Sequence, residues 1–288
     1  MNFFLRYWIR VFTNTIKNSL NFMAIPIICI FLIGLFQLAA VGFRRELLFL
    51  PFLLLIVGFI LSLFWTIVAV TITVLIKYKP NKMLNDLGFC QEYLEYFEKE
   101  IVAINPKDDM VALMYAEIHM KMGDPVTAIS VLDTRQIPES NIHQRAAYLH
   151  LYMTCALKKG DSSLADDIWR ANQQFLNRNL GRKRTAGYNH LLYLTLIYAD
   201  CAAGRYERAL KTLDDFMGSK LFRRYRSCEA DMQIIRVYLL KKLGRTAEFN
   251  SYSQLTAAFL AEYQPLYDSE KITLQRDFHK AMNGELPI

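Results

Sequence analysis

Thirty consecutive residues, 47–76, carry no Asp, Glu, Lys, Arg or His side chain. A second uncharged stretch covers residues 18–43, and only three residues, 44–46, separate the two. A core helix of a soluble domain presents a polar face to water, which neither stretch can provide. Because about 20 apolar residues cross the roughly 30 Å hydrocarbon layer of a bilayer, both stretches are long enough to span it. We therefore predict two membrane-spanning helices joined as a hairpin.

The predicted hairpin occupies residues 23–78, and its flanks carry the excess positive charge of the chain. Residues 1–82 contain eight Lys or Arg and one Glu, whereas residues 83–288 contain twenty-six residues of each sign. Basic residues are enriched on the cytoplasmic side of membrane spans. The outer flanks hold Arg6, Arg10, Lys17, Lys77, Lys79 and Lys82, and the connecting loop holds Arg44 and Arg45. This distribution predicts cytoplasmic N- and C-termini, with the cell membrane as the expected location.

A cleaved signal peptide is the alternative interpretation of the first apolar stretch. A signal peptide has a short basic segment followed by an apolar core of about 7–15 residues. Here about 20 residues precede the apolar core, and the core itself has the length of a span. We therefore favour a retained membrane helix.

Residues 1–22 have an aromatic face and a basic face. The apolar positions recur at helical spacing and are Phe3, Phe4, Tyr7, Trp8, Val11, Phe12 and Ile16. Arg6, Arg10 and Lys17 fall on the opposite side. This pattern predicts an amphipathic helix lying in the headgroup region of the bilayer, and the alternative is a simple lead-in to the first span.

Residues 83–284 contain four apolar-periodic runs that each end in glycine. Glycine just past a helix end adopts the left-handed conformation that satisfies the last carbonyl groups, so each glycine predicts a turn between paired helices. The glycines, each followed five residues later by the residue in parentheses, are Gly123 (Ala128), Gly160 (Ala165), Gly204 (Ala209) and Gly244 (Phe249). A small residue at that position lets the second helix of a pair approach the first closely.

These positions resemble the tetratricopeptide repeat. The best matches are Ala112, Tyr115, Ala116, Gly123, Ala128 and Leu132 in the first repeat, and Leu196, Gly204, Tyr206, Ala209 and Leu213 in the third. The resemblance covers residues 88–260, although the glycine spacings of 37, 44 and 40 residues exceed the period of about 34 in that family. It implies an all-α fold, in which two transmembrane helices are followed by an α-solenoid of tetratricopeptide-like helix pairs over residues 83–284. The alternative is an irregular helical bundle.

The spacing of apolar residues over 266–283 predicts a last amphipathic helix. Its candidate buried positions are Leu266, Ile272, Leu274, Phe278 and Met282. A stacked array of helices needs a polar closing helix where it meets water, and we assign this helix to that role.

Motifs of known enzyme and metal sites are missing from the sequence. It contains no glycine-rich phosphate loop, no HExxH, no GxSxG and no EF-hand loop. The five histidines are scattered, and the five cysteines show no spacing typical of a disulfide framework or a metal site. We therefore predict that the chain is not an enzyme and uses no cofactor or metal.

The first helices of stacked pairs line the concave side of such an array. Following the tetratricopeptide pattern, we predict partner-binding positions on that side at Glu117, Lys121, His150, Lys158, Tyr198, Tyr238 and Lys241, with Thr154 and Asp231 beside them. The family's clamp for a peptide carboxylate has an asparagine where this chain has Glu117, so that activity is not carried over. The mixed polar groove predicts an extended peptide or a helix of another protein as its ligand.

Charge is unevenly distributed along residues 83–288. Residues 83–177 carry eight Lys or Arg against fourteen acids, whereas residues 178–226 carry eleven against four. The basic clusters include Arg182, Lys183, Arg184, Arg223, Arg224 and Arg226, which we predict to contact anionic lipid headgroups or an acidic protein. Solvated connecting loops are the alternative. Nucleic acid is not expected, because no aromatic residues are interleaved with the basic ones.

Together these features predict a membrane-anchored adaptor or scaffold. The hairpin holds a helical array at the cytoplasmic face of the membrane, where the array recruits or organises other proteins. Such tethering raises the effective concentration of the array near its partners. The alternative is a regulatory or assembly subunit of an integral membrane enzyme or transporter.

Overall fold

The computed structural model describes residues 4–5, 7–9, 11–13, 45–182, 188–220, 222, 228–265 and 267–288. Within these ranges the chain is all-helical and contains no β-strand, as predicted for the fold class. The chain divides into two compact units, Met1–Asn85 and Asp86–Ile288.

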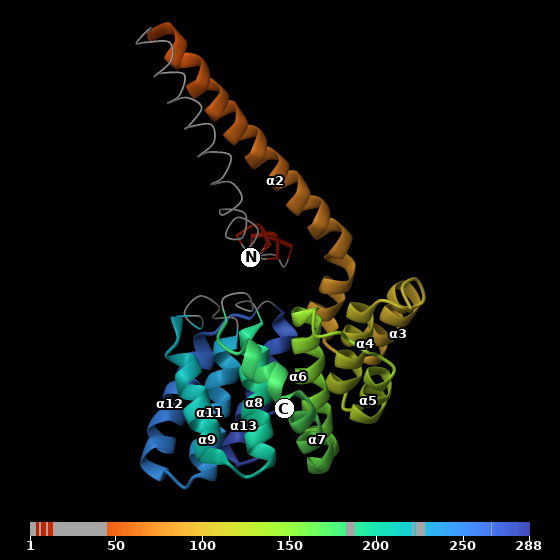
Figure 1. Ribbon diagram of the computed structural model, residues 1–288, viewed down its shortest axis with the longest axis vertical. Helices are drawn as coiled ribbons and strands as arrows, with labels where there is room; N and C mark the ends of the chain where they lie inside the picture. The colour runs from red at the N-terminus through yellow and green to blue at the C-terminus, as the bar shows by residue number, and fades with distance from the viewer. Residues whose placement is uncertain are drawn as a thin grey trace. The chain divides into compact units, whose positions relative to one another are not determined.

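In the first unit, the second apolar stretch forms part of the long helix α2 (Arg45–Leu87). Figure 1 shows that α2 changes direction near its C-terminal end, and its parts Leu63–Leu75 and Lys77–Leu87 meet at 55°. No single described helix has both the length and the apolar composition needed to cross a membrane, whereas these two parts together have both. The first predicted span lies outside the described residues.

The aromatic residues of the N-terminal segment pack against α2. The Trp8 Nε1–H donates a hydrogen bond to Thr71 Oγ1 at 3.1 Å, and Asn81 Nδ2 donates to the Tyr7 hydroxyl at 3.1 Å. The ring of Phe4 meets Tyr78 edge to face, with centroids 5.5 Å apart. Helix α2 therefore covers part of the face that we predicted to lie among lipid headgroups, burying Tyr7 and leaving Phe4 and Trp8 partly exposed.

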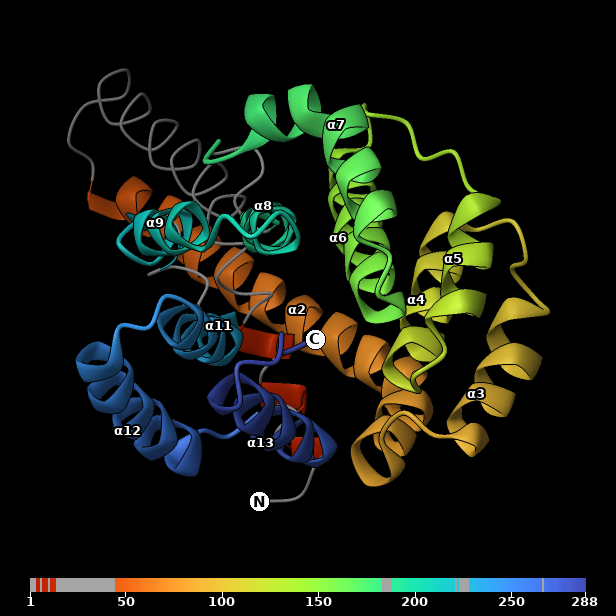
Figure 2. The same ribbon diagram turned by 90° about the horizontal axis from the view of Figure 1, so that it is seen from below.

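The second unit is built from consecutive helices joined by short connections. They are α3 (Gln91–Phe97), the π-helix η1 (Glu98–Val102), α4 (Asp109–Lys121), α5 (Pro125–Asp133), α6 (Ile142–Lys159), α7 (Ser162–Asn179), α8 (Asn189–Ala202), α9 (Tyr206–Met217), α11 (Glu229–Lys242), α12 (Thr246–Glu262) and α13 (Asp268–Met282). Figure 2 shows α4, α6, α8 and α11 on the inner side of a curve and α5, α7, α9 and α12 on its outer side. Helices α4, α6 and α8 contact one another in sequence, and each inner helix contacts the outer helix that follows it.

The turns between paired helices have the predicted backbone conformation. Gly123, Gly160, Gly204 and Gly244 all have positive φ, between 67° and 89°. The alanines predicted at the close approach of the second helix, Ala128, Ala165 and Ala209, are fully buried. Phe249, which stands at the same position in the fourth pair, is also buried. The glycine and alanine spacing therefore located the helix pairs correctly.

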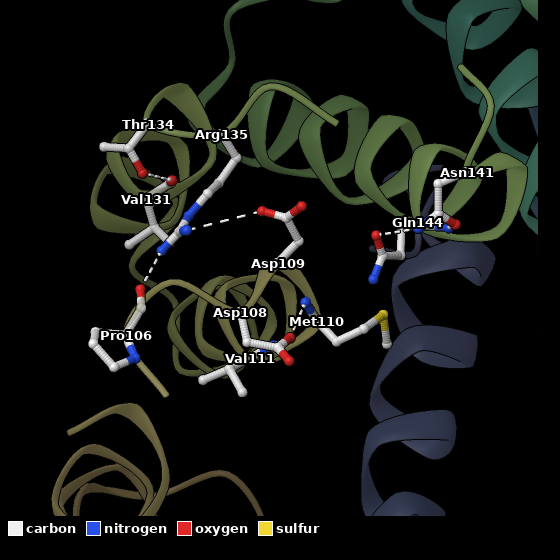
Figure 3. Close-up of polar contacts among 10 residues, drawn as sticks. All are labelled: Pro106, Asp108, Asp109, Met110, Val111, Val131, Thr134, Arg135, Asn141 and Gln144. Carbon is white, nitrogen blue, oxygen red and sulfur yellow. Dashed lines mark hydrogen bonds and ion pairs between the residues drawn. The ribbon is translucent and has the colours of Figure 1, made fainter. Parts of the chain in front are cut away.

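Polar contacts fix the first helix pair, α4 and α5, at the end opposite the turn at Gly123 (Figure 3). Asp108 Oδ1 accepts hydrogen bonds from the backbone N–H groups of Met110 and Val111, at 2.7 and 3.1 Å, and so caps the start of α4. Beyond α5, Arg135 Nη2 donates to the carbonyl oxygen of Pro106 at 2.8 Å. Arg135 Nη1 also lies 3.8 Å from Asp109 Oδ1. These contacts hold helix α4, which lines one wall of the candidate site.

Helix α13 lies on the inner side of the curve, where it packs against α11 (Figure 2). Leu274 and Ala281 are buried, in agreement with two-turn spacing along one face. Ile272, which we predicted to be buried, is 71% exposed. It lies two positions before Leu274 and therefore points to nearly the opposite side of the helix. Leu266 lies outside the described residues.

Replacing Gly160 by alanine is expected to lower the free energy of unfolding by about 1–2 kcal/mol, because a side chain with positive φ is strained. The φ angle of Gly160 is 77°, and no atom lies within 4 Å of the position that a Cβ would take, so the loss comes from the backbone alone. Gly160→Asn is the matched control, since asparagine tolerates this conformation better. Thermal unfolding followed by circular dichroism would contradict this account if both variants lost the same stability.

Candidate functional site

The inner helices enclose a pocket of about 340 Å³. Its walls come from α4, α6 and α8, from the start of α11, from α13, and from Pro287 and Ile288 at the end of the chain. This volume lies at the lower end of the range of about 300–1,000 Å³ that is typical of small-molecule sites. The pocket is therefore large enough for a side chain or a small ligand but not for a folded element.

Carboxylates from three helices line this pocket. Glu117 comes from α4, Asp231 from α11 and Asp277 from α13, and Lys121 is the cation that lines the pocket with them. The side chains of Glu117 and Asp231 reach water through the pocket, although protein atoms surround their carboxylates on most sides. Among the residues that the structure describes, neither forms an ion pair or a hydrogen bond with another side chain. Neither carboxylate therefore has a side-chain partner, whereas a backbone N–H group donates a hydrogen bond to the carboxylate of Asp231.

Burial changes the protonation of these acids. It raises the pKa of Asp231 to about 6, with Lys121 opposing the shift and the nearby acids Glu270 and Asp277 adding to it. Burial also raises the pKa of Glu117, and Lys121 again opposes the shift. A positive group entering the pocket would reverse part of this effect, because an opposite charge favours the ionised carboxylate.

An aromatic pair forms another part of the wall. The imidazole of His150 stacks on the ring of Tyr198, with centroids 5.8 Å apart and an interplanar angle of 20°. Burial lowers the pKa of His150 to about 3, and His190 and Lys121 lower it further. His190, which also lines the pocket, has its pKa lowered by burial. Both imidazoles are therefore neutral at pH 7, and the buried Nδ1 of His150 has no hydrogen-bond partner within the described structure.

The nearby lysines are bonded to backbone carbonyl groups. Lys158 Nζ donates to the carbonyl oxygen of Met120, at the end of α4, at 3.2 Å. Burial lowers the pKa of Lys158 to about 8, and the neighbouring Lys121, Lys280 and Arg276 lower it further. Lys280 Nζ donates to the carbonyl oxygen of Ile288 at 3.0 Å. These ammonium groups thus hold the walls of the pocket together.

The structure brings together only part of the predicted partner-binding set. Glu117, Lys121, His150 and Tyr198 line the pocket, as do Thr154 and Asp231. Lys158 lies beside it, as described above. Tyr238 is 4% exposed, and its ring meets Tyr206 in the core, so it is not available on the surface. Lys241 lies outside the pocket, with its Nζ 4.8 Å from the centroid of the Phe249 ring.

Sequence reasoning missed two polar residues of the pocket. His190 precedes Tyr198 by eight residues, which is close to two helical turns, so their shared face could have been found from spacing. Asp277 could not be found in this way, because its helix was assigned to the end of the array and lies instead on the inner side.

The predicted anionic-surface residues lie mostly outside the described part of the chain. Arg182 is described, is exposed, and donates from Nε to the carbonyl oxygen of Arg178 at 3.3 Å. Lys183, Arg184, Arg223, Arg224 and Arg226 lie outside the described residues. Their contact with lipid or with an acidic protein stays a prediction.

Asp231→Asn is expected to stabilise the folded chain by about 1 kcal/mol at pH 7.5. The pKa of Asp231 is higher in the folded than in the unfolded state, so ionisation between about pH 4 and pH 6 destabilises the folded state. Water in the pocket screens the charge and keeps the effect small. Below pH 4 the two chains should be equally stable. Thermal unfolding at pH 3.5 and pH 7.5 tests this, and a loss of stability in the variant at pH 7.5 would show that the carboxylate stabilises the fold.

Comparisons with known protein families, with curated proteins and with solved structures found no match to this chain. Among the described residues, no group of three or more His, Cys, Asp or Glu side chains is placed to hold a metal ion. The function is therefore inferred from the helix arrangement and from the chemistry of the pocket.

Proposed function

We propose that this chain is a membrane-anchored adaptor whose tetratricopeptide-like helical array binds segments of other proteins on its inner face. The main support for this proposal is that Glu117, Lys121, His150 and Tyr198 all line one pocket. These residues come from three different inner helices, so a ligand in the pocket would contact several helix pairs at once. The role is binding rather than catalysis, and it uses no cofactor.

The anchor is supported by the apolar surface of α2. Large apolar side chains along this helix are solvent-exposed, among them Ile60, Phe64, Trp65, Ile72 and Leu75. In water such a surface marks a membrane or protein contact, whereas in hydrocarbon it is favourable. Together with the uncharged first stretch, it supports a two-span hairpin, and the basic outer flanks favour cytoplasmic termini.

The solenoid interpretation is supported by the repeated construction of the helix pairs. Each of four pairs turns at a left-handed glycine, and three of them bury an alanine five residues later. Repeats of this kind cannot bury their apolar faces alone and gain a continuous core by stacking. The inner helices then form one surface, which is the expected binding face of such an array.

The proposal is tested by affinity purification from detergent extracts of cell membranes. The full-length chain is compared with a version that lacks residues 86–288, so that proteins captured through the membrane segment alone are subtracted. We expect at least one protein to be enriched by the full-length chain only. If none is enriched, the adaptor role is wrong.

A regulatory subunit of an integral membrane protein is the second candidate, favoured by the same exposed apolar face of α2. In that case the version lacking residues 86–288 would itself co-purify an integral membrane protein. Capture of such a protein by the membrane segment alone would decide for this second candidate over the adaptor.

A further inference from the structure

One exposed face of α2 changes from apolar to basic within a single helical turn. Ile72, Leu75, Lys79 and Lys82 recur at spacings of three, four and three residues, so they lie on the same side of the helix. Ile72 and Leu75 are 52% and 59% exposed, and both lysines are also exposed. Trp65, seven residues before Ile72, lies on this side too and is exposed. The face therefore suits hydrocarbon as far as Leu75 and a charged environment from Lys79 onward.

The helix also bends at this place. Its parts Leu63–Leu75 and Lys77–Leu87 meet at 55° (Figure 1). Pro80 has no backbone N–H, so the carbonyl group of Ile76, four residues earlier, lacks its usual helical donor. Such a carbonyl group is costly in hydrocarbon, whereas among lipid headgroups it finds water. The backbone therefore favours the same boundary as the side chains.

The threonines just before the bend pair their hydroxyl groups within the protein. Thr71 and Thr73 each donate to the backbone carbonyl oxygen four residues earlier, at 2.8 Å. Thr71 also accepts the hydrogen bond from Trp8 Nε1. A polar group in hydrocarbon needs such a partner, because no water is available there. This part of α2 is therefore compatible with burial in a bilayer.

The opposite face of α2 meets protein. Val74 is fully buried. Tyr78 meets the ring of Phe4, and Asn81 donates to the Tyr7 hydroxyl. These positions share one side of the helix, because 74, 78 and 81 follow each other at helical spacing. The lysine-bearing face is therefore the one that remains exposed to the surroundings of α2.

A face that is apolar and then basic matches the structure of a phospholipid, in which an acyl chain is followed by an anionic headgroup. An acidic protein would account for the lysines but not for the apolar part that continues from them. Lysines just outside the hydrocarbon attract anionic lipids, and their stems can lie along apolar surface. Building on the proposed membrane anchor, we infer that the hydrocarbon boundary crosses α2 between Leu75 and Lys79. We infer further that Lys79 and Lys82, with Lys77 beside them, bind the headgroups of anionic phospholipids.

Lipid preference is measured by fluorescence quenching of the full-length chain in phosphatidylcholine vesicles. Phenylalanine replaces all three tryptophans, and Leu75→Trp supplies one reporter on the lysine-bearing face. Phosphatidylserine and phosphatidylcholine, each with a quenching nitroxide near the headgroup end of one acyl chain, are compared at equal mole fraction. At low salt we expect the serine lipid to show an apparent affinity about fivefold higher at the reporter.

Removing the lysine charges should remove this preference. The Lys79→Gln, Lys82→Gln variant is expected to lower it to less than about twofold. The Lys99→Gln, Lys107→Gln variant is the matched control, because it removes the same charge from exposed positions of the second unit, and it should keep the full preference. Equal quenching by the two lipids, or a preference that survives in the Lys79, Lys82 variant, would overturn the inference. Equal quenching would leave an acidic protein as the candidate partner of these lysines.

The chain with its natural tryptophans provides a second measurement. It is purified in a mild detergent from vesicles that contain equal amounts of the two lipids, and the retained lipids are identified by mass spectrometry. We expect an excess of phosphatidylserine on the natural chain and equal amounts on the Lys79→Gln, Lys82→Gln variant. Equal retention by the natural chain would overturn the inference even if the reporter chain failed to fold.

Trp65 separates this inference from the proposed membrane anchor. It lies ten residues before Leu75, or about 15 Å along the helix, which is near the middle of a hydrocarbon layer of about 30 Å. In a chain that keeps Trp65 as its single tryptophan, nitroxides near the bilayer centre should quench more strongly than nitroxides near the headgroups. If Trp65 is quenched in this way but the serine lipid is not preferred at position 75, the lipid inference is wrong and the anchor stands. If nitroxides at neither depth quench Trp65, the anchor itself is wrong.

Discussion

Replacing Phe216 by alanine is expected to lower the free energy of unfolding of residues 86–288 by about 3–5 kcal/mol. Phe216 lies on α9 and is 1% exposed. Its ring stacks on Tyr193, with centroids 4.4 Å apart, and meets Phe222 edge to face at 5.4 Å. Removing the ring leaves a cavity between helices and breaks both aromatic contacts. The loss should therefore lie at the upper end of those seen for buried side chains.

The measurement is thermal unfolding of the full-length chain, followed by circular dichroism in detergent. For a unit of this size, the expected loss corresponds to a fall of about 10 °C in Tm. Leu255→Ala is the control, because Leu255 lies on α12 and is exposed, and it should change stability by less than about 0.5 kcal/mol. Similar shifts in the two variants would contradict the assignment of Phe216 to the core.

Asp200→Ala is the second large effect, with an expected loss of about 2–4 kcal/mol. Asp200 is 3% exposed on α8, and its carboxylate accepts hydrogen bonds from Arg205 Nε at 3.0 Å and from Arg208 Nε at 2.8 Å. Its backbone oxygen accepts from the Arg205 N–H at 2.8 Å, so the residue closes the turn between α8 and α9. The alanine variant loses the charged contacts and keeps only the backbone bond.

Asp200→Asn separates charge from shape. The amide keeps one acceptor oxygen, so the loss should be about half of that in the alanine variant. Asp166→Ala is the control for an exposed pair, since Asp166 lies 2.7 Å from Arg170 one turn away on the same helix, and it should cost about 0.5 kcal/mol or less. Equal losses in Asp200→Ala and Asp166→Ala would show that burial adds nothing to the Asp200 pairing.

Local signals in the sequence predicted much of the second unit. The turn glycines combine a special backbone need with regular spacing, and Ala128, Ala165 and Ala209 mark close helix contacts, so both features could be read without the structure. We expected all five cysteines to be small buried thiols. Among the described ones, Cys155, Cys201 and Cys228 are buried, whereas Cys90 is only partly buried.

Long-range placement could not be predicted in the same way. The position of α13 on the inner side depends on how the curve of helices leaves room beside α11, which no local pattern encodes. For the same reason Asp277 was missed in the pocket. The exposure of Ile272 could have been predicted from the sequence, because Ile272 and Leu274 are two positions apart and face nearly opposite sides of a helix. Asp200 was also missed, because its partners Arg205 and Arg208 lie beyond the turn that follows α8, and the sequence does not show that this turn brings them back to the carboxylate.

Site-specific photocrosslinking in living cells tests the central claim most directly. A photoreactive phenylalanine derivative is placed at Met114, which lines the pocket and is 43% exposed, or at Val126, which is 57% exposed on the outer helix α5. We predict that irradiation yields a protein adduct from position 114 and none from position 126. The absence of an adduct at 114, or equal adducts at both positions, would contradict binding of a partner on the inner face.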